Sequence, residues 1–199
     1  MSKLMPAADF RIKYRDVFHL QNLYIMLHEY LKEEGWQDEF QSDDHQFVEQ
    51  MYLERFIQKG IHVGGKELWI FWRLYKMPQR EYSGFVRNKL NIDFHLVYGK
   101  DQEIIFQGKK IKAQWGELEV FVKAWLEVDY AHKWAHHWFL KHFEHIYVER
   151  LASQQFAKRE KELWREAYNL QAKIKQYLNL KQFLTEPQEF HPKQFGMEA

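Results

Sequence analysis

The sequence predicts an α+β fold in which helices cover one side of an antiparallel sheet. Alternating apolar and polar residues recur between residues 67 and 130, as they do in half-buried strands. Two earlier stretches carry apolar residues three and four positions apart, which is typical of amphipathic helices. The stretch 129–180 contains neither Gly nor Pro and predicts one long C-terminal helix, or two helices in line. The expected order is therefore one strand, two helices, four or five strands and a final helix.

The N-terminal segment predicts a strand followed by a helix. Residues 9–14 alternate between apolar and charged side chains, as expected of a half-buried strand. We expect Asp16 to cap a helix that continues to Glu34, because Asp is a favoured N-cap residue. Gly35 is expected to end this helix.

A second helix is predicted over residues 42–59. Ser42 or Asp43 would cap it and Gly60 would end it. Its inner side would be formed by Phe47, Val48, Met51, Tyr52 and Phe56.

The middle of the chain predicts the antiparallel sheet. We expect strands over residues 67–77, 85–98, 103–106, 110–115 and 117–130. In the last of these, Leu118, Val120 and Val122 begin a row of apolar residues that alternate with charged ones. One side of the sheet is therefore apolar, and the helices are expected to cover it.

The long C-terminal helix is expected to have two halves with different apolar sides. In the first half a single stripe is expected to pack on the sheet, and it consists of Phe139, Leu140, Phe143, Ile146, Tyr147 and Leu151. In the second half a seam with steps of three and four residues runs from Val148 to Tyr177, and Arg159 interrupts it. The expected organisation is an α+β body (1–150), a helical extension (151–184) and an extended tail (185–199).

The second half of this helix predicts a protein interface, either with another helix of the chain or with a second copy. The residues expected there are Phe156, Leu163, Ala167, Leu170, Ile174 and Tyr177, and Trp134 and Trp138 on the exposed side of the first half are expected to add to the interface. Seams with this spacing pack helix against helix, and exposed Trp side chains are enriched at interfaces.

A group of His and Glu residues predicts a metal-binding site. His142, His145 and Glu149 would share one side of the helix, where imidazole and carboxylate groups can bind a transition metal. The alternative is that these His residues are ordinary surface groups. No cofactor is otherwise expected.

Two basic groups favour nucleic-acid binding, because cations beside an aromatic ring can follow a phosphate backbone and stack a base. They consist of Arg11, Lys13 and Arg15 on the first strand, and Lys109, Lys110 and Lys112 near Trp115. The alternative is that these charges protect exposed strand edges from aggregation.

Composition narrows the class of protein. The 199 residues carry a net charge of +1, which argues against binding a polyanion through bulk charge. Cys is absent, so neither disulfides nor Cys-ligated zinc are expected. No signal-peptide pattern and no apolar run of membrane-spanning length are present, so we expect a soluble, cytoplasmic protein. No catalytic motif is recognisable, which leans against an enzyme.

Four short stretches carry a resemblance to other proteins. They are WRLYK at Trp72–Lys76, DFHLVYG at Asp93–Gly99, FQGKKIK at Phe106–Lys112 and HWFLKHF at His137–Phe143. With them the chain resembles a family of small uncharacterised archaeal proteins, which implies an archaeal origin and no particular activity. The order of elements is also similar to the helix-grip arrangement of START-like proteins, in which a curved sheet wraps a C-terminal helix around an apolar cavity.

Three functions remain open from the sequence. The first is a non-enzymatic interaction or assembly protein that acts through the C-terminal helix and the Trp/His side chains. The second is a START-like domain that binds a small molecule or lipid in a cavity lined by Phe94, Leu96, Val122, Leu126 and Phe143. The third is an RNA-associated or ribosome-associated protein.

Overall fold

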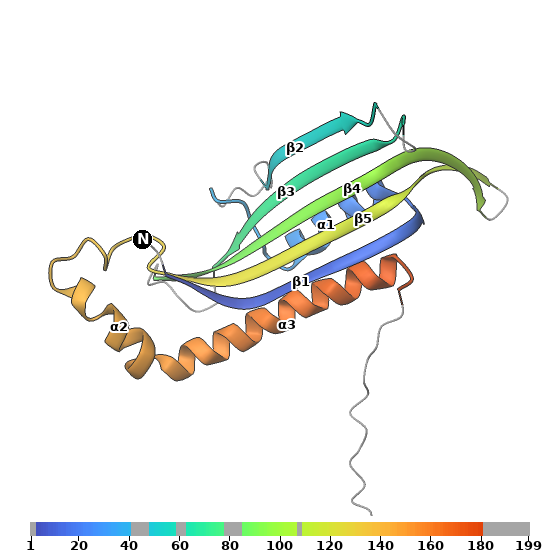
Figure 1. Cartoon of the computed structure of the whole chain (residues 1–199). Helices are drawn as coiled ribbons and strands as arrows, with labels where there is room; N and C mark the ends of the chain where they lie inside the picture. The colour runs from blue at the N-terminus through green and yellow to red at the C-terminus, as the bar shows by residue number, and fades with distance from the viewer. Residues whose placement is uncertain (1–2, 41–47, 59–62, 78–84, 107–108, 181–199) are drawn as a thin grey trace, which may run out of the picture.

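A computed structural model of the chain describes residues 3–40, 48–58, 63–77, 85–106 and 109–180 (Figure 1). Its centre is a five-stranded sheet in the order β1-β5-β4-β3-β2, in which all neighbouring strands are antiparallel. The strands are β1 (Lys3–Phe18), β2 (Glu49–Phe56), β3 (Lys66–Lys76), β4 (Val86–Phe106) and β5 (Lys109–Val128). Helices accompany this sheet, so the predicted α+β class is confirmed. The predicted tail, residues 185–199, lies outside the described residues.

The first strand and the first helix lie close to their predicted positions. β1 is longer than predicted because it pairs with β5 along its whole length. Helix α1 spans Leu20–Glu33, and its N-cap is His19, whose Nδ1 accepts a hydrogen bond from the backbone amide of Asn22 at 3.1 Å. The prediction of Asp16 as the cap was wrong, because Asp16 still belongs to β1. Gly35 follows the helix at a φ of +80°, as predicted for its end.

The second helix predicted over residues 42–59 is wrong, because residues 49–56 form the strand β2. The apolar residues of this stretch fit a helix and a strand equally well. The free edge of β3 decides between them, since pairing with it satisfies backbone donors and acceptors of both strands. The expected start at Ser42 or Asp43 and the expected stop at Gly60 lie outside the described residues.

Four of the predicted strands merge into one long hairpin of β4 and β5. β4 continues through a bulge at Tyr98, where its register with β5 shifts between Val97 and Lys100. Gly99 and Gly116 approach each other there, and a Cβ on Gly116 would lie 3.0 Å from the carbonyl oxygen of Val97. The two glycines therefore permit the close backbone approach at which the hairpin curves (Figure 1).

The uninterrupted helix predicted over residues 129–180 is wrong in its first half. At Asp129 the chain turns with a φ of +52°. The carboxylate of Asp129 accepts hydrogen bonds from the backbone amides of Trp134, at 3.1 Å, and Ala135, at 2.8 Å. These contacts fix a turn where a helix was expected. The His, Trp, Phe and Tyr residues that crowd the following stretch also have low helix propensity.

Short irregular turns connect this point to the last helix. They are a 3-10 turn (η1, Leu140–His142), a single α-helical turn (α2, Glu144–Ile146) and a π-helical turn (η2, Tyr147–Leu151). The regular helix is α3, Ser153–Tyr177. Figure 1 shows α3 lying along the sheet and α2 beyond the sheet's end.

Most of the apolar stripe predicted for the first half of the long helix does not pack on the sheet. Tyr147 does contact the smaller cluster beside the strands, with 5.6 Å between its ring centroid and that of Phe85. Of the other members, Phe139, Phe143 and Ile146 are exposed, and Leu151 is 77% exposed. The neighbouring Trp138 is 78% exposed. We call this exposed group, within residues 138–151, the apolar segment. It remains uncovered because the interrupted helix carries these side chains past the end of the sheet.

One side of the sheet packs against both helices and forms the main core. α1 contributes Leu23, Leu27 and Leu31, which are buried. α3 contributes the seam residues Leu163, Ala167, Leu170 and Ile174, and the strands contribute alternate residues from Leu68 to Leu74, Leu90 to Leu96 and Leu118 to Ala124. A second, smaller apolar cluster contains Phe85, Val86, Leu126, Val128, Val148, Ala152 and Phe156.

None of the helices in the described ranges combines the length and the apolar character that a membrane crossing requires.

Candidate functional site

The apolar pattern that builds the core is broken in three elements, and the three breaks lie together. In β3 the inward-facing residues Trp72 and Leu74 are buried, and the next inward-facing residue is Lys76. In β4 the inward-facing residues Leu90 and Ile92 are buried, and the inward-facing residue before them is Asn88. Lys76 and Asn88 are direct partners across the two strands. In α3, Arg159 stands between Phe156 of the smaller cluster and Leu163 of the main core. Polar residues of sheet and helix thus face one another between the two apolar clusters.

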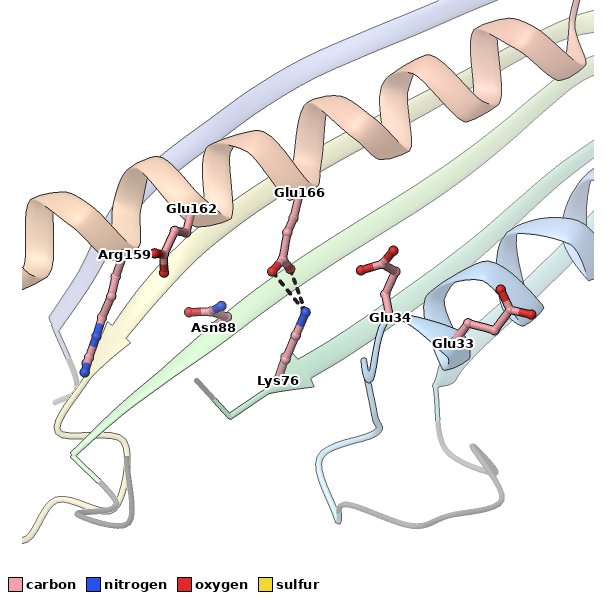
Figure 2. Close-up of a pocket in the computed structure, with 7 residues that line it drawn as sticks. All are labelled: Glu33, Glu34, Lys76, Asn88, Arg159, Glu162 and Glu166. Carbon is pink, nitrogen blue, oxygen red and sulfur yellow. Dashed lines mark hydrogen bonds and ion pairs between the residues drawn. The ribbon is translucent and has the colours of Figure 1, made fainter. Parts of the chain in front are cut away.

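A cavity of about 380 Å³ lies at this junction (Figure 2). Its walls come from the C-terminal end of α1, from α3 and from the ends of β3 and β4. The lining residues are Glu33, Glu34, Lys76, Asn88, Arg159, Glu162 and Glu166. Every one of them is polar or charged, which distinguishes this cavity from the apolar core beside it.

Lys76 is held by an ion pair across the cavity. Its Nζ lies 3.0 Å from both carboxylate oxygens of Glu166, as Figure 2 shows. The Lys76 side chain is 13% exposed, and its ammonium also lies 5.7 Å from the centroid of the Trp36 ring. A buried ammonium needs such a partner, because desolvation of an unpaired charge is costly. Glu166 is therefore occupied by Lys76.

Asn88 provides an unused hydrogen-bond acceptor in the cavity wall. The residue is 8% exposed, and its Oδ1 is buried without a hydrogen-bond partner. A buried polar atom left unpaired costs about 1–3 kcal/mol relative to a paired one. A donor brought into the cavity would remove this cost once the Asn88 amide turns its Oδ1 towards it. The sequence places an apolar residue on either side of Asn88 in the same row, Val86 and Leu90, so a leucine at this position would continue the core.

The cavity carries excess negative charge. Among the described residues that line the cavity, four glutamates face one lysine and one arginine, which leaves two negative charges. Glu33 and Glu34 lie at the C-terminal end of α1, where the helix dipole already disfavours anions and favours cations. Among the described residues, the ion pair of Glu162 is a long contact of 4.0 Å with the exposed Lys158. The potential in the cavity therefore attracts a cation.

A narrow recess of about 20 Å³ continues inward from the cavity. It shares Glu34 and Glu166 with the cavity and is otherwise lined mainly by Tyr30, Leu31, Trp36, Leu90, Ala167, Asn169 and Leu170. A space of this size holds about one water molecule or one methyl group.

Sequence reasoning predicted none of these residues as a site, although it noted one of the breaks in the apolar pattern. Arg159 stood out because it interrupts the apolar seam of α3. Lys76 and Asn88 gave the same kind of signal, a polar residue in an otherwise apolar strand row, and it was not used. The glutamates carried no signal, since charged residues on helices usually face solvent.

The predicted metal ligands come together only incompletely. His145 Nε2 lies 3.0 Å from Glu149 Oε2, and Lys3 Nζ lies 3.3 Å from the other oxygen of Glu149. His142 belongs to the separate turn η1. Across the described residues of the chain, no group of three or more His, Asp or Glu residues is placed to hold a metal ion.

Most of the predicted protein interface lies inside the chain's own fold. Phe156, Leu163, Ala167, Leu170 and Ile174 are buried in the two apolar clusters. The folded chain therefore does not present them to a partner.

The aromatic members of the predicted interface have separate environments. The hydroxyl of Tyr177 donates a hydrogen bond of 2.9 Å to the backbone carbonyl of His19. The Trp134 ring packs on Phe85, with 4.7 Å between the ring centroids. Only Trp138 of the predicted set is an exposed large apolar residue within the described ranges.

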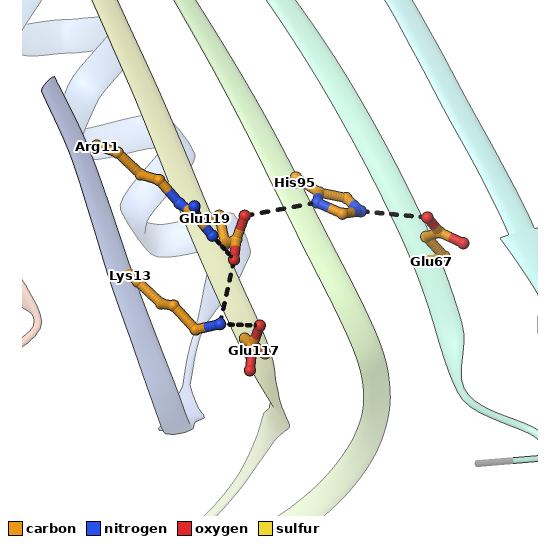
Figure 3. Close-up of polar contacts among 6 residues, drawn as sticks. All are labelled: Arg11, Lys13, Glu67, His95, Glu117 and Glu119. Atoms are coloured by element: carbon orange, nitrogen blue, oxygen red, sulfur yellow. Dashed lines mark hydrogen bonds and ion pairs between the residues drawn. The ribbon is translucent and has the colours of Figure 1, made fainter. Parts of the chain in front are cut away.

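The basic residues predicted for nucleic acid lie on the uncovered side of the sheet and on the β4–β5 hairpin. Arg11 is bonded to Glu119, and Lys13 Nζ lies 2.5 Å from Glu117 and 3.3 Å from Glu119 (Figure 3). The Arg15 guanidinium lies 5.9 Å from the centroid of the Trp115 ring. Lys110 and Lys112 are exposed on the hairpin, and Lys109 pairs there with Phe106. Carboxylates thus balance the charges of Arg11 and Lys13 on β1.

His95 joins two carboxylates on this uncovered side (Figure 3). Its Nε2 lies 3.2 Å from Glu67 and its Nδ1 lies 3.9 Å from Glu119, while its ring stacks on Trp69 with 3.7 Å between centroids. Burial acts to raise the pKa of Glu119, but hydrogen bonds from Arg11 and Lys13 outweigh it, so the pKa lies below its ordinary value. The pKa of Glu67 is lowered in the same way, by His95 and Arg55 against the effect of burial. On this surface the charges of Glu67 and Glu119 are therefore compensated by neighbouring cationic side chains and by His95.

The chain matches no protein-family model, no curated protein and no solved structure. The resemblance to an archaeal family stays a prediction.

Proposed function

We propose that this chain is a non-enzymatic domain that binds a small polar molecule in the cavity between α1 and α3. The observation that carries the proposal is the buried, unpartnered Oδ1 of Asn88 at the point where the apolar pattern fails in β3, β4 and α3. Three elements depart from the core pattern at one place, and at Asn88 the departure leaves a buried oxygen unpaired. Such local conflicts with the fold are expected at functional sites.

A helix-grip arrangement is included in this proposal. It is supported by the pairing of the first strand with the last one, by a helix directly after β1, and by a final helix on the sheet beside β1 and β5. One departure from the expected order is that a single helix, α1, stands between β1 and β2. Ligands of such folds lie between sheet and C-terminal helix, which is where the polar cavity lies.

The ligand we propose is polar, in contrast to the lipid considered from the sequence. Phe94, Leu96, Val122 and Leu126, expected to line an apolar cavity, are packed in the two apolar clusters. Phe143, expected beside them, is exposed on the apolar segment. A cavity lined by charged side chains would leave their charges unpaired against a lipid tail.

Mass spectrometry of the natively purified protein tests the proposal. Two leucine variants serve as a matched pair, because Asn88 and Asn91 lie on opposite sides of β4 and each has an unpartnered Oδ1. We expect a small molecule to copurify with the wild type and with Asn91→Leu, and to be absent from Asn88→Leu. A molecule retained equally by both variants would show that the cavity is not its site.

A second function, an interaction protein, is favoured by the apolar segment. Isolated exposed apolar residues are common, but a contiguous group with a Trp that is 78% exposed is typical of a contact surface. Light scattering over a range of protein concentrations tests this function. A wild type that associates and a Trp138→Ala variant that does not would support it, whereas a monomer at every concentration, without copurifying protein, would count against it.

A role with RNA is supported less well. Arg11 and Lys13 are paired with glutamates, and the whole chain has a net charge of +1. Affinity for nucleic acid depends on unpaired cations that displace counterions from phosphates. RNA binding that weakens steeply as the salt concentration rises would support this role.

A further inference from the structure

We propose that the ligand of the polar cavity is a short aliphatic polyamine, a chain that carries two or three ammonium groups. This inference rests on the proposed function and names the chemical class of its ligand. It follows from the charge of the cavity, from its one unused acceptor and from the arrangement of its carboxylates.

The charge of the cavity calls for a cation with more than one positive charge. After Lys76 and Glu166 neutralise each other, the described lining residues that remain charged are Glu33, Glu34, Glu162 and Arg159. Two of these glutamates stand at the negative end of the α1 dipole, so they repel the helix end as well as each other. A ligand with two ammonium groups would neutralise the two excess charges.

The unused acceptor calls for a ligand with N–H donors. The Oδ1 of Asn88 can be satisfied only by a hydrogen-bond donor, and a primary or secondary ammonium carries two or three. A quaternary ammonium has the charge and lacks the donor. A neutral diol has the donor and lacks the charge.

The spacing of the carboxylates argues for an extended cation over a metal ion. A calcium or magnesium ion needs several oxygens around one point. Among the described residues no group of three acidic or His side chains converges in that way. The cavity glutamates come instead from two separate helices, with Glu33 and Glu34 on one side and Glu162 on the other (Figure 2). A flexible chain with separated ammonium groups can reach both sides.

Isothermal titration of the full-length protein with spermidine tests this inference. We expect saturable binding at a single site that weakens as salt rises, because the glutamates at the mouth are open to solvent. Glu34→Gln and Glu162→Gln should each weaken binding by about three- to tenfold. The matched control is Glu160→Gln, a carboxylate on α3 outside the cavity lining, which should leave the affinity unchanged.

The role of Asn88 is tested with the same titration. Asn88→Leu should weaken spermidine binding by about tenfold or more, and Asn91→Leu should not change it. Tetramethylammonium and 1,4-butanediol should bind far more weakly than spermidine. Equal affinity for tetramethylammonium, or an unchanged affinity of Asn88→Leu, would overturn the inference.

The spermidine titration and the mass spectrometry together distinguish failure of the polyamine assignment from failure of the proposed ligand-binding function. Absence of saturable spermidine binding to the wild type would overturn the polyamine assignment. If another small molecule is then found on the wild type and not on Asn88→Leu, the cavity is still a ligand site, of different specificity. If the wild type binds neither, the proposed function fails as well.

Discussion

Lys76 and Asn88 face each other across β3 and β4 on the side of the sheet that the helices cover, in a row where the neighbouring strand β5 carries the buried Leu126. One of the two is paired with Glu166, and the other keeps an unpartnered oxygen. Two polar side chains at core positions of adjacent strands interrupt packing between the main core and the smaller cluster. Stability alone would favour an apolar residue at the position of Asn88, whose oxygen has no partner, whereas Lys76 is compensated by Glu166.

Replacing Asn88 with leucine should therefore stabilise the protein. Leu is of similar size, continues the apolar row and removes the unpaired oxygen, so we expect the free energy of unfolding to rise by about 1–2 kcal/mol. Urea denaturation followed by circular dichroism measures it. Asn88→Asp is the opposing control, because a carboxylate would add charge to an already acidic cavity and should destabilise. A leucine variant less stable than the wild type would mean that the Asn88 amide makes a contact the protein needs.

The sheet could be predicted from the sequence because its apolar residues alternate over long stretches. In β5, each of Leu118, Val120, Val122 and Leu126 is buried as that period requires. β2 could not be predicted, since its eight residues are all exposed and the edge of β3, a feature of the tertiary fold, selects the strand. The break at Asp129 was missed because periodicity does not reveal a carboxylate that caps backbone amides in a turn.

Shortening a side chain of the α3 seam should show whether the seam packs in the core of one chain or between two copies. Leu163 and Leu170 are fully buried under the helix, so Leu163→Ala should lower the free energy of unfolding by about 2–5 kcal/mol. Trp138→Ala, at an exposed position of the apolar segment, should change it by less than about 0.5 kcal/mol. Chemical denaturation of both variants at several protein concentrations measures this. A loss for Leu163→Ala that depended on protein concentration would instead place the seam between two copies.

Lys76 and Glu166 in the cavity should stabilise each other, so the effects of replacing them on the free energy of unfolding should not be additive. Glu166→Gln leaves the Lys76 ammonium, 13% exposed, without its carboxylate and should cost about 1–3 kcal/mol. Lys76→Met should cost less, because Glu166 lies nearer to solvent and Met preserves the apolar stem. A double-mutant cycle measures the coupling energy. Additive losses in the double variant would show that the two side chains do not interact.

The candidate site was predictable only where it broke a regular pattern. Arg159 interrupts the α3 seam and was noticed, and Lys76 and Asn88 interrupt strand rows with the same clarity. What the sequence could not supply was their coincidence, because residues 76, 88 and 159 meet only once strand pairing and helix packing are fixed. The ion pairs of Arg11 and Lys13 were hidden for the same reason, since their partners lie about a hundred positions away on β5.

The pairing of Glu119 with Arg11 and Lys13 should make stability depend on pH in the acid range. The pKa of Glu119 in the folded protein lies below its ordinary value of 4.5, so the folded state takes up the proton at lower pH than the unfolded state. Its contribution is therefore present above about pH 4.5 and is lost as the pH falls through the folded-state pKa. Because both cationic partners are half exposed, we expect Glu119→Gln to cost only about 1 kcal/mol at neutral pH. In urea titrations at each pH, the difference from wild type should shrink progressively as the pH falls below 4.5, while the exposed Glu103→Gln serves as the matched control on the same sheet. A difference that stayed constant from pH 7 to pH 3 would mean that Glu119 acts through packing and not through its charge.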